Sequence, residues 1–289
     1  MSKSTYLSLC KIQSQKASGK PYLISIAVRV MNELGALSLF WESLVKQTIY
    51  NNLEITFLDS GSTDGTLELL QTYNCNIYTI TKNEFRFGDS CNLMMELTNS
   101  QLVYFFSGHI ILEDPSLLED SYLFIKDDIG SGYFRQIPNK ILGYSNYDKA
   151  FLKNRFPRYP LSSPIRIVKK HSFSNAAAII NRAHWELVKF EDVLFGEDEI
   201  WAEAVLKKQG KLYYFHAYNI LHSHNDSYDD VYKRVSMAAK VKFPNGINVF
   251  KLGYIFAKVF AAVFLSSMKL KSSLKYAYAH SKAYKDIKK

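Results

Sequence analysis

Cysteine is scarce in this sequence. Only three of the 289 residues are cysteine, Cys10, Cys75 and Cys91, and no two of them form a CxxC pair. Zinc ribbons and disulfide frameworks need closely spaced cysteines, so neither class of protein is expected. The hydrophobic content of 47% is enough for one large core. We therefore expect a reduced, cytosolic chain.

Common leader and nucleotide-binding signatures are also missing. Residues 1–20 hold no apolar h-region, so we expect no secretory signal. DSGSTDGT, at 59–66, contains neither the Gly-Lys-Ser/Thr of a Walker A loop nor a GxGxxG motif. Its small residues still leave backbone N–H groups for a phosphate or a nucleotide edge. We interpret Ser62 and Asp64 as caps of the following helix, whereas Asp59 precedes the cap, where an acid has little structural use.

Arginine is absent from the C-terminal part of the chain. Residues 240–289 contain 11 lysines and one acid, Asp286, for a charge of +10, so the rest of the chain carries −1 of the total of +9. Nucleic-acid-binding domains usually interleave arginine through the fold, so the near-neutral body argues against a nucleic-acid partner. Lysine beside apolar residues suits an anionic membrane surface.

Apolar runs and helical spacing alternate through the first hundred residues. The runs predict strands at 22–31, 53–58, 76–80 and 102–106, with helices between them at 34–48, 66–73 and 88–98. This spacing indicates βαβ units and an α/β fold with a mostly parallel sheet flanked by helices. Ligands of such sheets bind beyond the carboxyl ends of the strands, where Asp59 and His109 lie.

The pattern changes after residue 115. A polar, aromatic stretch to about residue 165 predicts a loop-rich insertion with short strands. Residues 197–208 then have helical spacing, with Trp201 packing the helix. We expect three parts: a polar N-terminal tail over 1–21, a main domain over 22–240, and a lysine-rich helical extension over 241–289.

Three groups of side chains could carry chemistry. Glu197 and Asp198 open a helix, where they are either caps favoured by the helix dipole or a general base at the ligand edge of the sheet. His222 and His224 alternate along an extended segment, so they point to the same side; they could equally be solvated loop residues. With His109 they could form a metal or phosphate site, and imidazole with carboxylate suits Mn²⁺ or Zn²⁺ better than Mg²⁺.

Segments in one order resemble a known family. ISIAVRVMNE, ITFLDSGSTDGT, a strand ending in SGH, and GEDEIWA are together similar to inverting glycosyltransferases of family 2. NEFRFGDSCN, YFRQIP, FSNAAAI and HSH resemble its bacterial rhamnosyltransferase or polysaccharide-assembly branch. The resemblance covers about residues 22–235 and implies a Rossmann-like GT-A fold.

The resemblance also implies a role for each matching residue. Asp198 would be the catalytic base, with Glu197 supporting it or meeting the acceptor. Seven residues would bind the nucleotide-sugar donor: Arg29, Glu33, Asp59, Ser90, Asn92, Ser107 and His109.

The DxD motif of the family falls on Ser107-Gly108-His109, which lacks both acids. Two devices could neutralise the departing diphosphate. One is a divalent metal, Mn²⁺ or Mg²⁺, bound by His109 with His222 or His224. The other is a metal-free site in which His109 and basic residues act directly.

The C-terminal part predicts a membrane-surface helix. Lys251, Lys258 and Lys269 fall on one helical stripe, and the longest uncharged run, 259–268, is too short to span a bilayer. We expect residues 247–289 to lie in the plane of an anionic membrane; the alternative is a helix packed on the body or on a second subunit.

We therefore expect a peripheral enzyme on the cytoplasmic face of the cell membrane. The resemblance implies transfer from dTDP-rhamnose or a UDP-sugar to a lipid-linked glycan or a growing surface polysaccharide, such as capsule, O-antigen or lipopolysaccharide. An oligomer is compatible with the sequence. The alternative function is a non-catalytic GT-A module for binding or scaffolding.

Overall fold

The computed structural model describes residues 6–169 and 172–288. The chain divides into two compact units. The first contains the residues up to 135 together with 158–192 and 197–220, and the second contains 136–157, 193–196 and 221 onward. This division differs from the predicted boundary at residue 240, because helices before that residue pack with the C-terminal helices.

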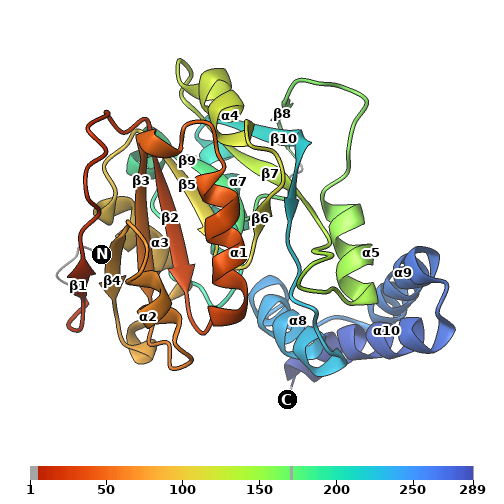
Figure 1. The fold of residues 1–289 in the computed structure, drawn as a ribbon. Coiled ribbons are helices and arrows are strands. Elements are labelled where there is room, and N and C mark those ends of the chain that lie inside the picture. The colour runs from red at the N-terminus through yellow and green to blue at the C-terminus, as the bar shows by residue number, and fades with distance from the viewer. Residues whose placement is uncertain (1–5, 170–171, 289) are drawn as a thin grey trace. The chain divides into compact units, whose positions relative to one another are not determined.

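A ten-stranded sheet forms the first unit (Figure 1). Its order is β1-β4-β3-β2-β5-β9-β7-β10-β6, with β8 paired to β10. The strands are β1 (Cys10–Gln13), β2 (Ile24–Val30), β3 (Leu53–Asp59), β4 (Asn76–Thr79), β5 (Leu102–Ser107), β6 (Ile111–Leu112), β7 (Gly130–Ile137), β8 (Ile165–Ile167), β9 (Ala177–Asn181) and β10 (Lys211–Leu221).

The predicted parallel sheet is confirmed in its centre. Strands β4, β3, β2 and β5 pair in parallel. Antiparallel strands extend this centre: β1 pairs with β4, β9 pairs with β5, and β7 pairs with β9. The sheet is therefore mixed, with the predicted βαβ units at its middle.

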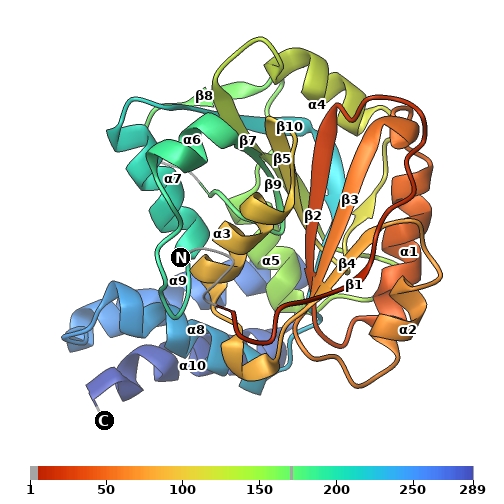
Figure 2. The ribbon, with the colours of Figure 1, turned by 90° about the vertical axis from the view of Figure 1, so that its left-hand side faces the viewer.

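Helices cover both faces of this sheet, with α1 on one face and α3 and α7 on the other (Figure 2). That is why β3 is buried along its whole length although it alternates polar and apolar residues. Its polar Glu54 accepts hydrogen bonds from Ser25 and Asn99. The helices of this unit are α1 (Leu34–Val45), α2 (Thr66–Leu70), α3 (Phe87–Leu97), α4 (Leu117–Ile125), α6 (Arg182–Leu187) and α7 (Glu197–Lys207), with 3-10 turns at Tyr50–Asn52 and Lys82–Glu84.

The N-terminal tail is more ordered than its polarity suggested. β1 pairs with β4 from Cys10 to Gln13. Gln13 Nε2 donates to Tyr73 O at 2.6 Å, and Gln15 Nε2 donates to Leu53 O at 2.9 Å. The polar side chains therefore bind backbone at the sheet edge, which composition alone does not show.

The predicted loop-rich insertion is also corrected. Residues 115–165 contain the helices α4 and α5 (Asn146–Arg155) and the whole of the long strand β7. α5 begins with a capping box, in which Ser145 Oγ accepts from Asp148 N at 3.0 Å and the Asp148 carboxylate accepts from Ser145 N at 3.0 Å. Tyrosine, asparagine and proline in this stretch concealed these local start signals.

The second unit is helical. It contains α5, α8 (Tyr228–Lys242), α9 (Val249–Ser267) and α10 (Leu270–Lys285), followed by a 3-10 turn at Asp286–Lys288. These helices share a small apolar core of Tyr147, Ala150, Val231, Val235, Val263, Tyr276 and Ala283. Residues predicted to form a peripheral tail, such as Tyr276, are thus part of a packed core.

Helix α9 presents an apolar row to solvent. Phe250 is 91% exposed and Leu265 is 75% exposed, and the side chains of Tyr254 and Met268 are exposed as well. Phe250, Tyr254 and Leu265 are separated by about one and three helical turns, so they share one face, and Met268 follows at the C-cap of the helix. Lys258, one turn beyond Tyr254, borders that row.

The prediction that this segment is too short to span a bilayer was wrong. The helix has 19 residues with a mean hydropathy of 1.7, so it is long and apolar enough, by length and composition, to cross a membrane. Only 6% of the window is buried within the protein. The uncharged run of ten residues underestimated the length of the apolar helix, because Lys251 and Lys258 lie within the helix and divide its apolar sequence.

Candidate active site

Asp59 ends β3 and holds the turn that follows. Its Oδ1 accepts hydrogen bonds from the N–H groups of Gly61 and Ser62, each at 3.1 Å, and its Oδ2 accepts from Ser62 Oγ. An acid therefore has a clear structural use at this position, contrary to our expectation. The predicted contact of Asp59 with a nucleotide base stays a prediction.

Ser62 and Asp64 were predicted to cap the following helix, but Gly65 is the N-cap of α2 and no side-chain cap bond forms there. The two polar side chains instead accept from backbone N–H groups around the loop. Asp64 Oδ1 accepts from Thr66 N at 3.0 Å, and Asp64 Oδ2 accepts from Leu34 N at 3.1 Å. Ser62 Oγ accepts from Asn32 N at 2.9 Å. These bonds tie the loop after β3 to the start of α1, so the ligand edge of the sheet is preorganised.

His109 lies just beyond the end of β5, where Ser107 is the last strand residue. Its Nδ1 is 2.9 Å from Glu33 Oε1, and both side chains are about one-fifth exposed, at 17% and 21%. A Cβ on Gly108 would lie 2.9 Å from Val30 Cγ1, so glycine is needed between Ser107 and His109. The predicted donor residues Glu33 and His109 therefore contact each other.

Arg29, which is half-buried, and the buried Glu197 pair at the ligand edge of the first unit. Arg29 donates to Phe87 O at 2.9 Å, and its Nη2 lies 3.5 Å from Glu197 Oε1. Burial acts to lower the pKa of the Arg29 guanidinium, but the nearby carboxylates of Glu197 and Asp198 act against burial, and the pKa is raised. Arg29 thus carries a permanent positive charge, which offsets one of the two negative charges of the acid pair.

Asp198 differs from its neighbour Glu197 in exposure. Glu197 is 6% exposed, whereas Asp198 is only half-buried. Asp198 Oδ1 accepts from Glu199 N at 2.8 Å, and Asp198 Oδ2 accepts from Asn175 N at 3.1 Å. Two backbone donors and the N-terminus of α7 all favour the ionised carboxylate, which is the form that accepts a proton.

Three residues of this cluster received no role from the sequence. Cys91 is buried, and its thiol lies 3.9 Å from Glu197 Oε1 and 3.3 Å from Asn175 Nδ2. Burial raises the pKa of the Cys91 thiol, so it stays protonated. Tyr6 is buried beside Ser90, and burial raises the pKa of Tyr6 to about 12. Cys91 and Asn175 lay within the resembling segments, but nothing in the sequence signalled Tyr6.

The predicted donor residues on α3 have different surroundings. Ser90 is fully buried beside Tyr6. Asn92 Nδ2 donates to Phe190 O at 2.9 Å, and Asn92 Oδ1 accepts from Trp185 Nε1 at 2.9 Å. Because both ends of this amide bind the protein, the structure gives the predicted contact of Asn92 with a diphosphate no support.

Trp201 packs inside the first unit, as predicted. Its ring stacks on Phe190 with centroids 5.0 Å apart, and its Nε1 donates to Val188 O at 2.8 Å. Trp201 therefore fixes α7, and with it Glu197 and Asp198, against the sheet.

His222 and His224 follow β10 and lie in the second unit. Their ring centroids are 4.8 Å apart. Gln136 Oε1 lies 2.7 Å from His222 Nδ1, which places the proton on Nδ1 and the lone pair on Nε2. Adjacent imidazoles of this kind fit Mn²⁺ or Zn²⁺. Because His109 belongs to the first unit, its joint binding of one ion with this pair stays a prediction.

The sequence matches a family model described as glycosyl transferase family 2 over residues 25–186, more than half of the chain. The chain belongs to this family. The match ends just before the acid pair, so β2, the Asp59 turn and the SGH motif lie within it, and Glu197 and Asp198 lie beyond it.

One curated relative of this family 2 chain is the O-antigen chain rhamnosyltransferase WbaN of Salmonella anatum. The two are 25% identical over 184 residues, which span 60% of this chain and 57% of the relative. The chain therefore matches little more than half of that protein's length.

Solved structures show the GT-A fold of this family 2 chain. TarS 1-349 from S. aureus, in complex with UDP-GlcNAc, is 13% identical with a TM-score of 0.56, covering 92% of this chain and 91% of TarS 1-349. The mannosyltransferase PcManGT from Pyrobaculum calidifontis, in complex with GDP-Man and Mn²⁺, is also 13% identical with a TM-score of 0.56, covering 92% of this chain and 76% of the other.

Proposed function

We propose that this protein transfers a sugar from a nucleotide donor to a hydroxyl group of a glycan, with inversion and with Asp198 as the general base. The observation that carries this proposal is the contrast within the acid pair. Glu197 is buried on Arg29, whereas Asp198 is half-buried and held by two backbone N–H groups. A base must reach the acceptor and keep a fixed orientation, and Asp198 meets both conditions.

The proposed reaction is a single in-line displacement. Asp198 takes the proton of the acceptor hydroxyl while the acceptor oxygen attacks the anomeric carbon. The bond from that carbon to the diphosphate oxygen breaks, and the nucleoside diphosphate leaves with the electron pair. Glu197 positions Arg29 and α7 and does not contact the substrate, because its carboxylate is bound inside the protein.

The leaving group needs a positive charge beside it. We propose that His222 and His224 hold a divalent ion, and that His109 acts on the diphosphate as a further ligand or as a cation. The carboxylate of Glu33 can hold the proton on His109 Nδ1 in the first case and stabilise an imidazolium in the second. A bound Mn²⁺ would supply Lewis-acid stabilisation of the departing diphosphate.

For the substrates, dTDP-rhamnose is the proposed donor and a lipid-linked or growing surface glycan the proposed acceptor. The name of the Salmonella relative supports both. A UDP-sugar is the second candidate donor, because TarS binds UDP-GlcNAc.

The proposed location is the cytoplasmic membrane surface. The exposed apolar row of α9 would lie in the headgroup region, with Lys251 and Lys258 toward anionic lipid. An in-plane placement is favoured over a span, because a crossing helix would carry Lys258, at its middle, into the hydrocarbon. An oligomer remains compatible with this placement.

A nucleotide panel tests the proposal. Melting temperatures are measured with UDP, dTDP, GDP and CMP, each with and without Mn²⁺, because a ligand of the folded state raises the melting temperature. We expect a shift with dTDP and, from the matching nucleotide-sugar, acceptor-dependent release of nucleoside diphosphate. A shift without release in the presence of a glycan acceptor would favour the non-catalytic GT-A module, which the missing DxD acids support. No shift with any nucleotide would contradict the proposed function.

A further inference from the structure

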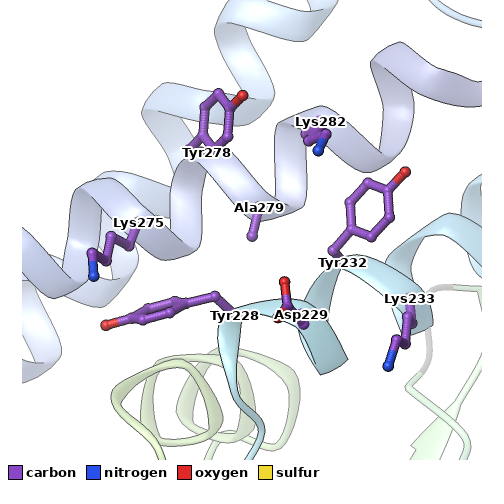
Figure 3. Close-up of a pocket in the computed structure, with 8 residues that line it drawn as sticks. All are labelled: Tyr228, Asp229, Tyr232, Lys233, Lys275, Tyr278, Ala279 and Lys282. Carbon is purple, nitrogen blue, oxygen red and sulfur yellow. The ribbon is translucent and has the colours of Figure 1, made fainter.

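A groove of about 490 Å³ lies between α8 and α10 in the second unit (Figure 3). Its lining combines aromatic rings with amines: Tyr228, Asp229, Tyr232, Lys233, Lys275, Tyr278, Ala279 and Lys282. The lining contains three lysines and one aspartate, so its net charge is +2. Neither the family match nor the proposed reaction uses this groove.

Two of the lysines are paired with tyrosine rings across the groove. Lys275 Nζ lies 5.1 Å from the centroid of the Tyr228 ring, and Lys282 Nζ lies 5.1 Å from the centroid of the Tyr232 ring. In Figure 3 these pairs reach from α10 toward α8. Cation–π contact holds each amine beside a ring while leaving its N–H groups able to bind an anion.

The spacing of the pairs indicates the size of the anion. Tyr228 and Tyr232 are one turn apart on α8, about 6 Å along the helix axis at 1.5 Å per residue. Lys275 and Lys282, which carry the two ammonium groups, are seven residues apart on α10, about 10 Å along the helix axis. That separation suits the outer oxygens of two linked phosphates better than a single phosphate. The small Ala279 between Lys275 and Lys282 leaves room for them.

The floor and ends of the groove favour an extended ligand. Tyr232 OH donates to Asp286 Oδ2 at 2.9 Å, so this ring is fixed in place. Tyr278 is 63% exposed and offers an open ring face at the rim. Such rings suit stacking of a sugar or an isoprenoid chain beside the charged group.

We propose that the groove between α8 and α10 binds the diphosphate of a lipid-anchored substrate at the membrane surface. The lipid source is favoured over a soluble diphosphate because α9, in the same unit, presents its exposed apolar row with bordering lysines. This inference rests on the proposed transfer to a lipid-linked acceptor and locates the part of the protein that holds the carrier.

The test compares two double variants of α10 in the full chain. Lys275→Gln/Lys282→Gln removes the two groove lysines, and Lys271→Gln/Lys285→Gln removes two exposed lysines of the same helix that do not line the groove. All four side chains are exposed, so both variants should fold, and circular dichroism checks this. Binding is measured by flotation with phosphatidylcholine vesicles that contain geranylgeranyl diphosphate, or phosphatidylglycerol at equal surface charge.

We expect the wild type and the control variant to prefer the diphosphate vesicles by about tenfold, and the groove variant to lose that preference. An equal loss in both variants would show general attraction to negative charge and would overturn the proposal. So would an unchanged preference in the groove variant. Equally tight binding of inorganic pyrophosphate alone would overturn the lipid source, and competition by single-stranded RNA that depends on the same two lysines would favour a nucleic-acid surface instead.

The nucleotide panel separates this proposal from the proposed function. The donor residues lie in the first unit, whereas the groove lies in the second. A nucleotide shift with no preference among vesicles would refute the groove alone. Loss of both signals would refute the function on which it rests.

Discussion

Glu33 Oε1 lies 2.9 Å from His109 Nδ1, which joins the N-terminal end of α1 to the end of β5. The histidine occupies the place of the second acid in the DxD motif of the resembling family. A carboxylate at Nδ1 fixes the orientation of the ring and leaves Nε2 to act on a ligand. The Glu33–His109 pair can therefore replace the missing acids of the DxD motif, either by binding a metal ion or by acting directly on the diphosphate.

Glu33→Gln should weaken binding of the donor nucleotide. In the metal-bound case we expect the affinity in the presence of Mn²⁺ to fall about 10- to 100-fold, because an amide orients His109 less firmly. Calorimetric titration with and without Mn²⁺ measures this. Glu42→Gln, an exposed acid on the same helix, is the control. A loss that is identical without Mn²⁺ would favour the metal-free site, and unchanged affinity would remove the pair from the donor site.

Asp198→Asn should abolish most of the transfer while nucleotide binding survives. An amide keeps much of the local hydrogen bonding but cannot take a proton, so we expect turnover to fall about 10²- to 10⁴-fold. Release of nucleoside diphosphate measures the rate, and the nucleotide-dependent melting shift measures binding. Glu203→Gln, an exposed acid on α7, should leave both unchanged. Near wild-type turnover in Asp198→Asn would remove the base assignment.

Phe250→Ser/Leu265→Ser should release the protein from anionic vesicles. Each substitution removes an exposed apolar side chain from α9, and together they should reduce partitioning at least about tenfold. Flotation measures this, with Val168→Ser/Leu187→Ser as a control on exposed apolar residues of the first unit. Substitution is preferable to deletion of 245–289, which would remove Val263 and Tyr276 from the core of the second unit. Binding that resists both substitutions and high salt would favour a membrane span instead.

His280 should make the second unit acid-sensitive. It packs against Tyr284, with ring centroids 5.6 Å apart, and burial lowers the pKa of His280 to about 4. The unfolded chain then binds a proton that the folded chain does not, between about pH 6.5 and pH 4. Stability is therefore lost as the pH falls through this window, by up to about 3 kcal/mol.

His280→Leu isolates this effect. The difference in unfolding free energy between wild type and variant should shift toward the variant as the pH falls from 7 to 4, measured by urea denaturation. Asp226, whose pKa burial raises to about 6, is present in both proteins, so its opposite pH dependence cancels from the difference. A difference that does not change with pH would show that His280 is solvated in the folded state.

Local pattern predicted the elements of the sheet centre well. The apolar runs at β2, β3, β4 and β5 lie within one or two residues of their observed bounds, because buried parallel strands have a strong composition signal. The sequence pattern did not predict β1 or α5. The pairing of β1 with β4 depends on a distant strand, and the start of α5 depends on a capping box within a polar stretch.

The sequence likewise predicted only part of the candidate site. The types and order of residues sufficed to place Asp59, His109 and the Glu197–Asp198 pair at the carboxyl edge of a sheet. They did not show that Asp59 holds its own turn, or that Asn92 binds the 185–190 segment through both ends of its amide. Hydrogen-bond partners far apart in the chain leave no periodic signal in a sequence.

The sequence by itself determined the family, the βαβ core and the residue types at the strand ends, because these follow from local periodicity and from segments in a set order. Only the tertiary structure decided that Glu197 is buried on Arg29 while Asp198 is half-buried. The same holds for the lysine-rich helices, which pack into a unit with a core and a groove. Burial and pairing are properties of surfaces brought together from distant parts of the chain, so they appear only when the chain has folded.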